Sequence, residues 1–195
     1  MVATVVVPFR SGGKSRLPAE VRSDLALAML GDVLQAAVMH DREVRLVTGD
    51  AGAVKIALSL GAEVIADPGG GQGAAVEAAL LGAEGTCLVV NADLPCATPA
   101  ALNRLEELAP ALAAAADGTT NALALPERTW FTPRYGAGSA ARFAAGGLAS
   151  VSIPELEHDV DTLEDLVDLE RLGLPLGRRT DLVLNQHKVL AVRTA

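Results

Sequence analysis

The segment Cys87-Leu88-Val89-Val90-Asn91-Ala92-Asp93-Leu94-Pro95 joins an apolar run to an aspartate and a proline. Four successive apolar residues are typical of a short strand that is covered on both faces. Because this strand ends just before Asp93, the carboxylate is expected at the carboxyl end of a buried sheet, where open α/β sheets bind their ligands. The segment therefore predicts a class of fold and a position for a site.

Apolar runs alternate with helical patterns along the rest of the chain. Strands are expected at 2–7, 44–47, 62–66, 87–90 and 121–125, and helices at 19–39, 51–60, 72–81, 98–116 and 162–172. This alternation indicates βαβ units. The expected fold class is α/β, with one domain at 1–172, a mainly parallel sheet and helices on both faces. A tail at 173–195 has no clear role, and 188–192 within it is a candidate strand.

The helix ends carry their own signals. Thr98 is expected to cap its helix, with Pro99 at the first helical position. Thr162 is expected to open the last helix in a capping box, with Asp165 in place of the usual Glu or Gln. The run Ala113–Ala116 is interpreted as a helix end.

Composition limits the possible functions. The 195 residues are 50% hydrophobic but only 3% aromatic, so Ala, Val and Leu must build the core. A net charge of −8 argues against general nucleic-acid binding. The chain shows no membrane-length apolar stretch and no basic leader, and its two cysteines lack metal-ligand spacing. We therefore expect a cytoplasmic protein with reduced thiols and with no nucleic-acid or membrane partner.

A second acidic cluster is formed by Asp159-Val160-Asp161. In an extended segment Asp159 and Asp161 point to the same face, and two such carboxylates repel each other unless they hold a cation. Together with Asp93 they can supply oxygen ligands for Mg²⁺, whose other positions go to phosphates. The alternative is an acidic surface run, with Asp93 acting only as a turn cap.

The loop Lys14-Ser15-Arg16 is basic and follows two glycines. It is not a P-loop, because that motif needs a glycine at the position of Pro8. Glycines and cations at a strand-to-helix turn nevertheless suit phosphates, and a solvated basic loop is the alternative. Nucleophilic catalysis has little support, because the three histidines lack triad-like neighbours.

In their order along the chain, these segments resemble the 2-phospho-L-lactate or phosphoenolpyruvate guanylyltransferase family of coenzyme F420 biosynthesis, which is related to molybdenum-cofactor guanylyltransferases. The matching pieces are Val7-Pro8, Lys14–Leu17, Asp32-Val33-Leu34, Asn91–Pro95, Gly118–Leu123, Tyr135-Gly136 with Ser139, and Asp159–Thr162 before Glu164-Asp165-Leu166. The resemblance implies a single Rossmann-like nucleotidyltransferase domain.

The resemblance also implies a reaction. GMP passes from GTP to a phosphorylated three-carbon acid, with release of pyrophosphate; the acid is phosphoenolpyruvate in bacterial members and 2-phospho-L-lactate in archaeal ones. The resemblance implies Mg²⁺ binding by Asp93, Asp159 and Asp161 and acceptor binding near Thr120, Gly136 and Ser139. Our own hypothesis adds nucleotide binding by Pro8, Lys14, Arg16, Gly71 and Asp93, and catalysis by Lys14, Arg16 and Asp93. The oligomeric state stays open, with a homodimer as one candidate.

Three positions depart from the family pattern. Arg10 stands where lysine is common, Gly73 where an asparagine is expected to contact the nucleotide, and Phe143 where histidine commonly follows the arginine. The alternative functions are a related nucleotidyltransferase with another nucleotide or acceptor, and an inactive relative that binds a nucleotide.

Overall fold

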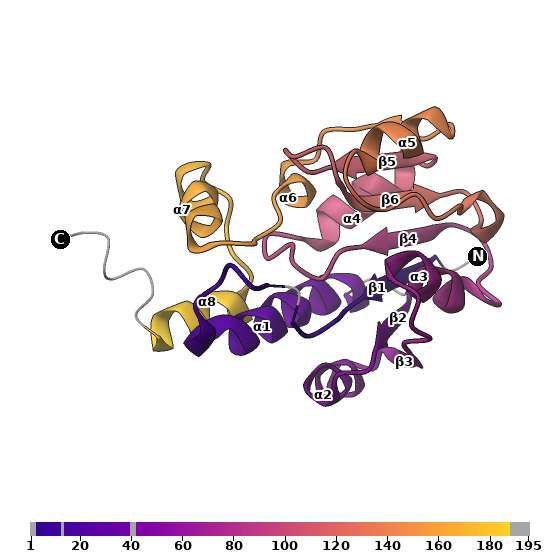
Figure 1. The fold of residues 1–195 in the computed structure, drawn as a ribbon. Helices are drawn as coiled ribbons and strands as arrows, with labels where there is room; N and C mark the ends of the chain where they lie inside the picture. Colours follow the sequence, from indigo (N-terminus) through magenta and orange to yellow (C-terminus); the bar gives the residue numbers. More distant parts are fainter. Residues whose placement is uncertain (1–2, 13, 40–41, 188–195) are drawn as a thin grey trace.

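The computed structural model describes residues 3–12, 14–39 and 42–187. In this part of the chain seven strands form one sheet in the order β3-β2-β1-β4-β6-β5-β7 (Figure 1). The strands are β1 Thr4–Pro8, β2 Glu43–Thr48, β3 Glu63–Ala66, β4 Cys87–Val90, β5 Ala111–Ala114, β6 Thr120–Leu125 and β7 Ala149–Ser150. The candidate strand at 188–192 lies outside the described residues.

The sheet is mainly parallel, as predicted. Strands β1 to β4 run parallel to one another, and β5 runs parallel to β7, whereas β6 runs antiparallel to both β4 and β5. The chain passes outward from β1 to β2 and β3 and then returns to β4 on the other side of β1. Loops that leave β1 and β4 therefore diverge at a topological switch point, which is a preferred place for ligands in open α/β sheets.

Helices cover both faces of the sheet, also as predicted. They are α1 Ala19–Val38, α2 Ala51–Ser59, α3 Gln72–Leu80, α4 Pro99–Glu107, α5 Ser139–Ala145, α6 Pro154–Glu157, α7 Leu163–Arg171 and α8 Arg178–Gln186, with a 3₁₀ turn at Arg128–Trp130. Along β4, Leu88 and Val90 pack toward α1, α2, α4 and α6, while Val89 packs toward α3 and α5. This alternation follows from the two-residue period of a strand. None of the described helices combines the length and apolar character needed to cross a bilayer.

A third apolar cluster lies outside the sheet. It joins Leu17, Cys96 and Val160, which belong to three different loops, to side chains of α1, α7 and α8. In Figure 1 the yellow α8 lies beside the indigo α1. The tail beyond residue 172 thus contains a packed helix that the sequence analysis did not predict.

The helix predicted at 98–116 is wrong beyond Glu107, and Ala113–Ala116 is not a helix end. Pro110 has no amide hydrogen to donate, and its ring cannot continue the helix. Ala111–Ala114 instead form β5, which pairs with β6 and is largely buried. Alanine favours helices, so local propensity pointed to the wrong structure and the pairing of the sheet overrode it.

The start of α4 agrees with the prediction and gives a test of stability. The Thr98 hydroxyl accepts a hydrogen bond from the Ala101 amide at 3.1 Å. Thr98→Ala should lower the free energy of unfolding by about 1 kcal/mol, because that amide loses its cap. Urea denaturation checks this value, with Thr98→Ser as the control that keeps the hydroxyl. Equal stability of Thr98→Ala and the wild type would contradict it.

Candidate metal and nucleotide site

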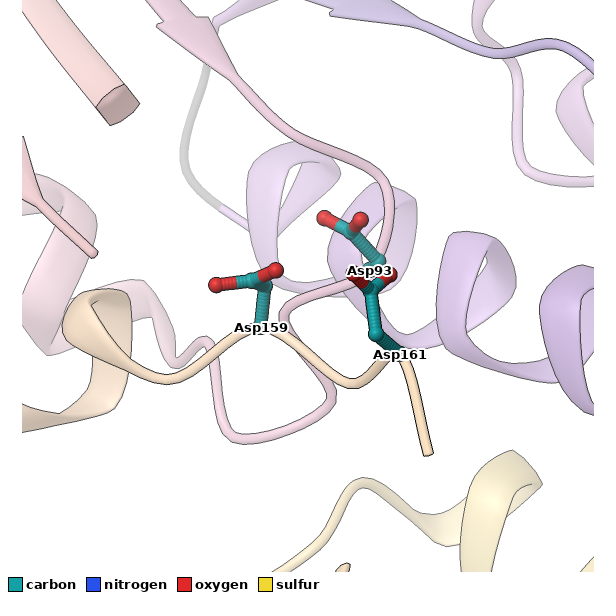
Figure 2. Close-up of side chains that lie close together, drawn as sticks. All are labelled: Asp93, Asp159 and Asp161. Atoms are coloured by element: carbon teal, nitrogen blue, oxygen red, sulfur yellow. The ribbon is translucent and has the colours of Figure 1, made fainter. Parts of the chain in front are cut away.

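Three carboxylates meet beyond the carboxyl end of β4. Asp93 lies in the loop after β4, whereas Asp159 and Asp161 come from the segment between α6 and α7 (Figure 2). One oxygen from each side chain lies within 4.8 Å of the others. The Val160 amide donates to the Asp93 carbonyl at 3.0 Å, so a backbone hydrogen bond joins the two segments.

The capping box of α7 holds one of these carboxylates in place. The Asp165 carboxylate accepts hydrogen bonds from the amides of Thr162 and Asp161, and Thr162 accepts one in return from the Asp165 amide. The predicted capping box is therefore confirmed. The Asp165 carboxylate also fixes the backbone of Asp161, and this determines the position from which the Asp161 side chain projects.

Lys14 lies against this cluster. Its Nζ is 2.5 Å from Asp93 Oδ2 and 2.6 Å from Asp161 Oδ1. Burial alone lowers the pKa of the Lys14 ammonium, but the charges of Asp93 and Asp161 and the hydrogen bonds to them outweigh burial and raise its pKa above the ordinary value. Lys14 therefore remains a cation at the point where the basic loop meets the acidic residues.

The acidic residues suit a divalent cation. Asp93 Oδ1 is buried and has no hydrogen-bond partner among the described residues. Burial raises the pKa of Asp159, and the nearby charge of Asp93 raises it further. A hard divalent cation bound by carboxylate oxygens would give Asp93 Oδ1 a partner and relieve the repulsion between Asp159 and Asp93. Asp93, Asp159 and Asp161 are thus the residues that can hold such a metal.

A cavity of about 690 Å³ opens beside Lys14, at the carboxyl ends of the parallel strands. Pro8, Lys14, Asp93 and Asp161 all contribute to its lining. Its volume falls within the usual range for small-ligand sites. The structure therefore brings three of the five predicted nucleotide contacts together around one cavity.

The other two predicted nucleotide contacts lie elsewhere. Arg16 is 74% exposed, and its Nη1 is 3.9 Å from Asp161 Oδ2. It lines a smaller neighbouring pocket of about 170 Å³ with Lys14 and Asp161. Gly71 precedes α3 with a positive φ of 96°, a conformation that favours glycine, and its neighbour Gln72 does line the large cavity.

Of the departures from the family pattern, Arg10 lines the large cavity, and Gly73 directly follows Gln72, which lines it as well. The Arg10 guanidinium donates to Asp67 through two hydrogen bonds of 2.6 and 2.9 Å, and the bond from Arg10 lowers the pKa of that carboxyl. At Gly73 a Cβ would lie 2.7 Å from Pro133 Cβ, so a side chain has no room there. An amide is still present in this turn, because Gln72 Nε2 donates to Asn91 Oδ1 at 2.8 Å.

The predicted acceptor contacts form a separate group. The hydroxyls of Thr120 and Ser139 are buried and lie 3.0 Å apart, and neither residue lines the large cavity. Gly136 has a φ of 106° in a loop whose carbonyls accept hydrogen bonds from Arg142. Phe143, the third departure, is buried and packs against Tyr135 with ring centroids 5.4 Å apart.

Two asparagines that sequence reasoning did not assign connect these groups. Asn121 Nδ2 donates to Asp159 Oδ1 at 3.3 Å, and Asn91 Nδ2 donates to the Thr120 carbonyl at 3.1 Å. Because β6 is antiparallel to β4, its first residues lie at the edge where β4 ends. An expectation of antiparallel pairing would have placed Asn121 beside the acidic cluster; a parallel sheet would have put it at the far edge.

Solved structures share this fold. A protein of Desulfovibrio desulfuricans G20 matches with a TM-score of 0.73 and 19% identity over 97% of both chains. A nucleotidyl transferase of Methanothermobacter thermautotroptrophicus matches with a TM-score of 0.64 and 16% identity over 88% of this chain and 97% of its own. A Mycobacterium tuberculosis H37Rv protein solved in complex with manganese matches with a TM-score of 0.55 and 23% identity, over 86% of this chain and 97% of its own.

Three relatives of known name share more of their sequence with this chain than these solved structures do. A phosphoenolpyruvate guanylyltransferase of Salinispora arenicola is 38% identical, with 93% of each chain covered. The protein of the same name from Streptomyces avermitilis is 37% identical over 91% of each chain. The one from Mycobacterium leprae is 32% identical over 87% of this chain and 88% of its own.

The Rossmann-like sheet carries acidic residues and a lysine at its switch point, and together with the guanylyltransferase relatives it identifies this chain as a nucleotidyltransferase. The profile of the family described as "Guanylyl transferase CofC like" matches residues 3–145. The chain therefore belongs to the CofC-like guanylyl transferases. The resemblance drawn from the sequence motifs is confirmed.

Proposed function

We propose that this enzyme transfers GMP from GTP to phosphoenolpyruvate, with release of pyrophosphate, in coenzyme F420 biosynthesis. The family and the names of its relatives support the reaction class and the acceptor. The observation that carries the proposal is the contact of Lys14 with Asp93 and Asp161 beside a cavity of nucleotide size. 2-Phospho-L-lactate is the alternative acceptor.

Asp93, Asp159 and Asp161 would hold Mg²⁺. The bound ion supplies charge neutralisation for the phosphates of the donor and the acceptor. The side chains must keep three oxygens converged, and Asn121 and the capping box of α7 do this for Asp159 and Asp161. Since the acceptor phosphate is already anionic at neutral pH, the chain needs no general base.

Lys14 and Arg16 would bind the triphosphate. When the acceptor phosphate oxygen attacks the α-phosphorus, the bond from that phosphorus to the β-phosphate bridging oxygen breaks and pyrophosphate leaves. Lys14 and Arg16 lie 2.6 and 3.9 Å from Asp161, so both cations would be near the metal site and could stabilise the negative charge on the departing pyrophosphate. A Mg²⁺ ion held by the carboxylates would repel the Lys14 ammonium, so the Lys14 side chain would turn toward the phosphates.

Thr120, Gly136 and Ser139 would seat the acceptor. Thr120 precedes Asn121, which contacts Asp159, so this group adjoins the acidic cluster from the β6 side. Arg142 holds the loop around Gly136 through several carbonyls, and such a preorganised loop can orient an anion without large rearrangement. The donor would then approach the acidic residues from the β1 side of β4, and the acceptor from the β6 side.

Pyrophosphate release with a panel of nucleotides tests the proposal. We expect release with GTP and phosphoenolpyruvate, little with ATP, CTP or UTP, none after EDTA, and recovery when Mg²⁺ is added. A downstream F420-pathway enzyme in the assay traps the labile product. Equal rates with all four nucleotides, or activity that survives EDTA, would contradict the proposal. Preference for 2-phospho-L-lactate would change the acceptor alone.

A further inference from the structure

Asp32 is a buried carboxylate in the middle of α1, within the motif Asp32-Val33-Leu34, and the proposed chemistry does not use it. Its oxygens accept three hydrogen bonds from the beginning of α8. The amides of Arg179 and Thr180 lie 2.9 and 2.8 Å away, and the Thr180 hydroxyl lies 2.7 Å away. A residue of the first helix thus satisfies the amide groups that open the last described one.

This contact replaces an ordinary helix cap. The N-cap position of α8 is Gly177, which has no side chain to accept those amides. A Cβ at Gly177 would lie 2.2 Å from Asp32 Cγ, and one at Gly31 would lie 2.5 Å from Arg179 Cδ. Two glycines therefore let α8 approach α1 closely, and the Asp32 carboxylate takes the capping role at the positive end of the helix dipole.

The capped end of α8 contacts the loop that carries Asp93. The Gly177 amide donates to the Pro95 carbonyl at 2.7 Å. The Cys96 thiol makes a weaker contact of 3.9 Å with the Leu174 carbonyl. Burial raises the pKa of the Cys96 thiol to about 12, so this side chain remains an uncharged donor. The segment that leads into α8 is therefore bonded two residues from a predicted metal ligand.

The third apolar cluster extends this connection. Val160, between the other two carboxylates, packs in the same cluster as Cys96, Leu17 and Leu184 of α8. Leu17 follows the basic loop. Each of the three loops of the proposed site thus places one side chain, Leu17, Cys96 or Val160, in the cluster to which α8 also contributes. Loosening α8 would give all three loops freedom to move.

We propose that Asp32 is a positioning residue: by capping α8 it holds the Asp93 loop and the Asp159–Asp161 segment at the spacing that a divalent cation needs. The inference rests on the metal site of the proposed function, although the mechanical link between Asp32 and Val160 can be tested without that function. Residues that support metal ligands typically change metal affinity by about 10- to 100-fold when they are replaced.

The experiment compares full-length variants in two measurements. Asp32→Ala removes the cap, and Leu184→Ala loosens the same helix without touching Asp32. Leu105→Ala is the control: it is a buried residue of the last turn of α4, outside the third cluster, and its loss destabilises the core. Mn²⁺ affinity is measured by calorimetry, and the exchange rate of the Val160 amide, which donates to Asp93, is measured by NMR.

We expect Asp32→Ala to weaken Mn²⁺ binding by about tenfold and to speed Val160 exchange well beyond the control. Leu184→Ala should change both in the same direction, and it decides the matter if Asp32→Ala does not fold. Val160 exchange no faster than in Leu105→Ala would overturn the inference, and so would faster exchange with wild-type Mn²⁺ affinity. A wild type that binds no Mn²⁺ contradicts the proposed function alone, and Val160 exchange then decides the inference.

Discussion

Asp93→Asn is expected to reduce GTP-dependent pyrophosphate release by about 1000-fold, or ~4 kcal/mol in activation free energy, while the protein stays folded. The substitution keeps the size of the side chain but removes one negative charge from three converging carboxylates. Asp93 Oδ1 is the buried acceptor without a partner among the described residues, so the loss falls on the oxygen best suited to a metal. Steady-state kinetics over a range of Mg²⁺ concentrations measures the effect.

Asp168→Asn is the matched control for this variant. Asp168 lies on α7 and pairs with Arg171 on the surface, so the same change of charge there should leave the rate unaltered. Circular dichroism of both variants shows whether the fold is kept. Substantial turnover by a folded Asp93→Asn enzyme would rule out the metal assignment.

Lys14→Met is expected to lower kcat/KM for GTP by about 100- to 1000-fold. Methionine keeps much of the length of the side chain but removes the ammonium that would bind the triphosphate. Without that cation, Asp93 loses its ion pair and Asp161 keeps only the longer one with Arg16, so these two carboxylates and Asp159 repel one another. Lys14→Met should therefore melt at a lower temperature than the wild type, and Mn²⁺ should raise its Tm by more than it raises the wild-type Tm.

Lys55→Met serves as the control, because Lys55 is an exposed residue of α2. It should change neither the kinetics nor the response to metal. The two measurements on Lys14→Met separate two roles for the ammonium. A lost Mn²⁺ response would mean that Lys14 organises the carboxylates, whereas unchanged kcat/KM would remove it from the nucleotide site.

The sequence predicted the parallel half of the fold because that half follows simple rules. β-Branched and apolar runs at β1, β2 and β4 gave strands, and the two-residue period placed Asp159 and Asp161 together. Polar residues at the ends of such strands meet at one edge, so Asp93 was predictable as well. Here local pattern and tertiary structure agree.

The antiparallel half of the sheet was harder to predict from the sequence. In β5 the residues Ala111–Ala114 have helical propensity, and only Pro110 signals a break. The direction of β6 is not encoded in the strand itself, because it depends on the path of the chain through β5. Contacts that join β6 to the site, such as Asn121 to Asp159, therefore could not be placed without knowing the topology.

The support of the site was not predictable for a different reason. Asp32 and Thr180 lie far apart in the sequence, and an aspartate inside an apolar helix face gives no sign of its partner. Gly177 and Gly31 are informative only once α8 is known to cross α1. Long-range caps and close helix crossings of this kind leave no periodic pattern along the chain.

The packing of α8 on α1 also has a consequence for protein synthesis. α8 follows every other described element, so it leaves the ribosome after the sheet and the three acidic side chains have already emerged. Until then the Asp32 carboxylate lacks its hydrogen-bond donors from α8, and the loops of the site lack the apolar contacts that α8 provides. A nascent chain stalled before α8 should consequently hold folded strands and yet bind a metal ion more weakly than a chain that includes α8.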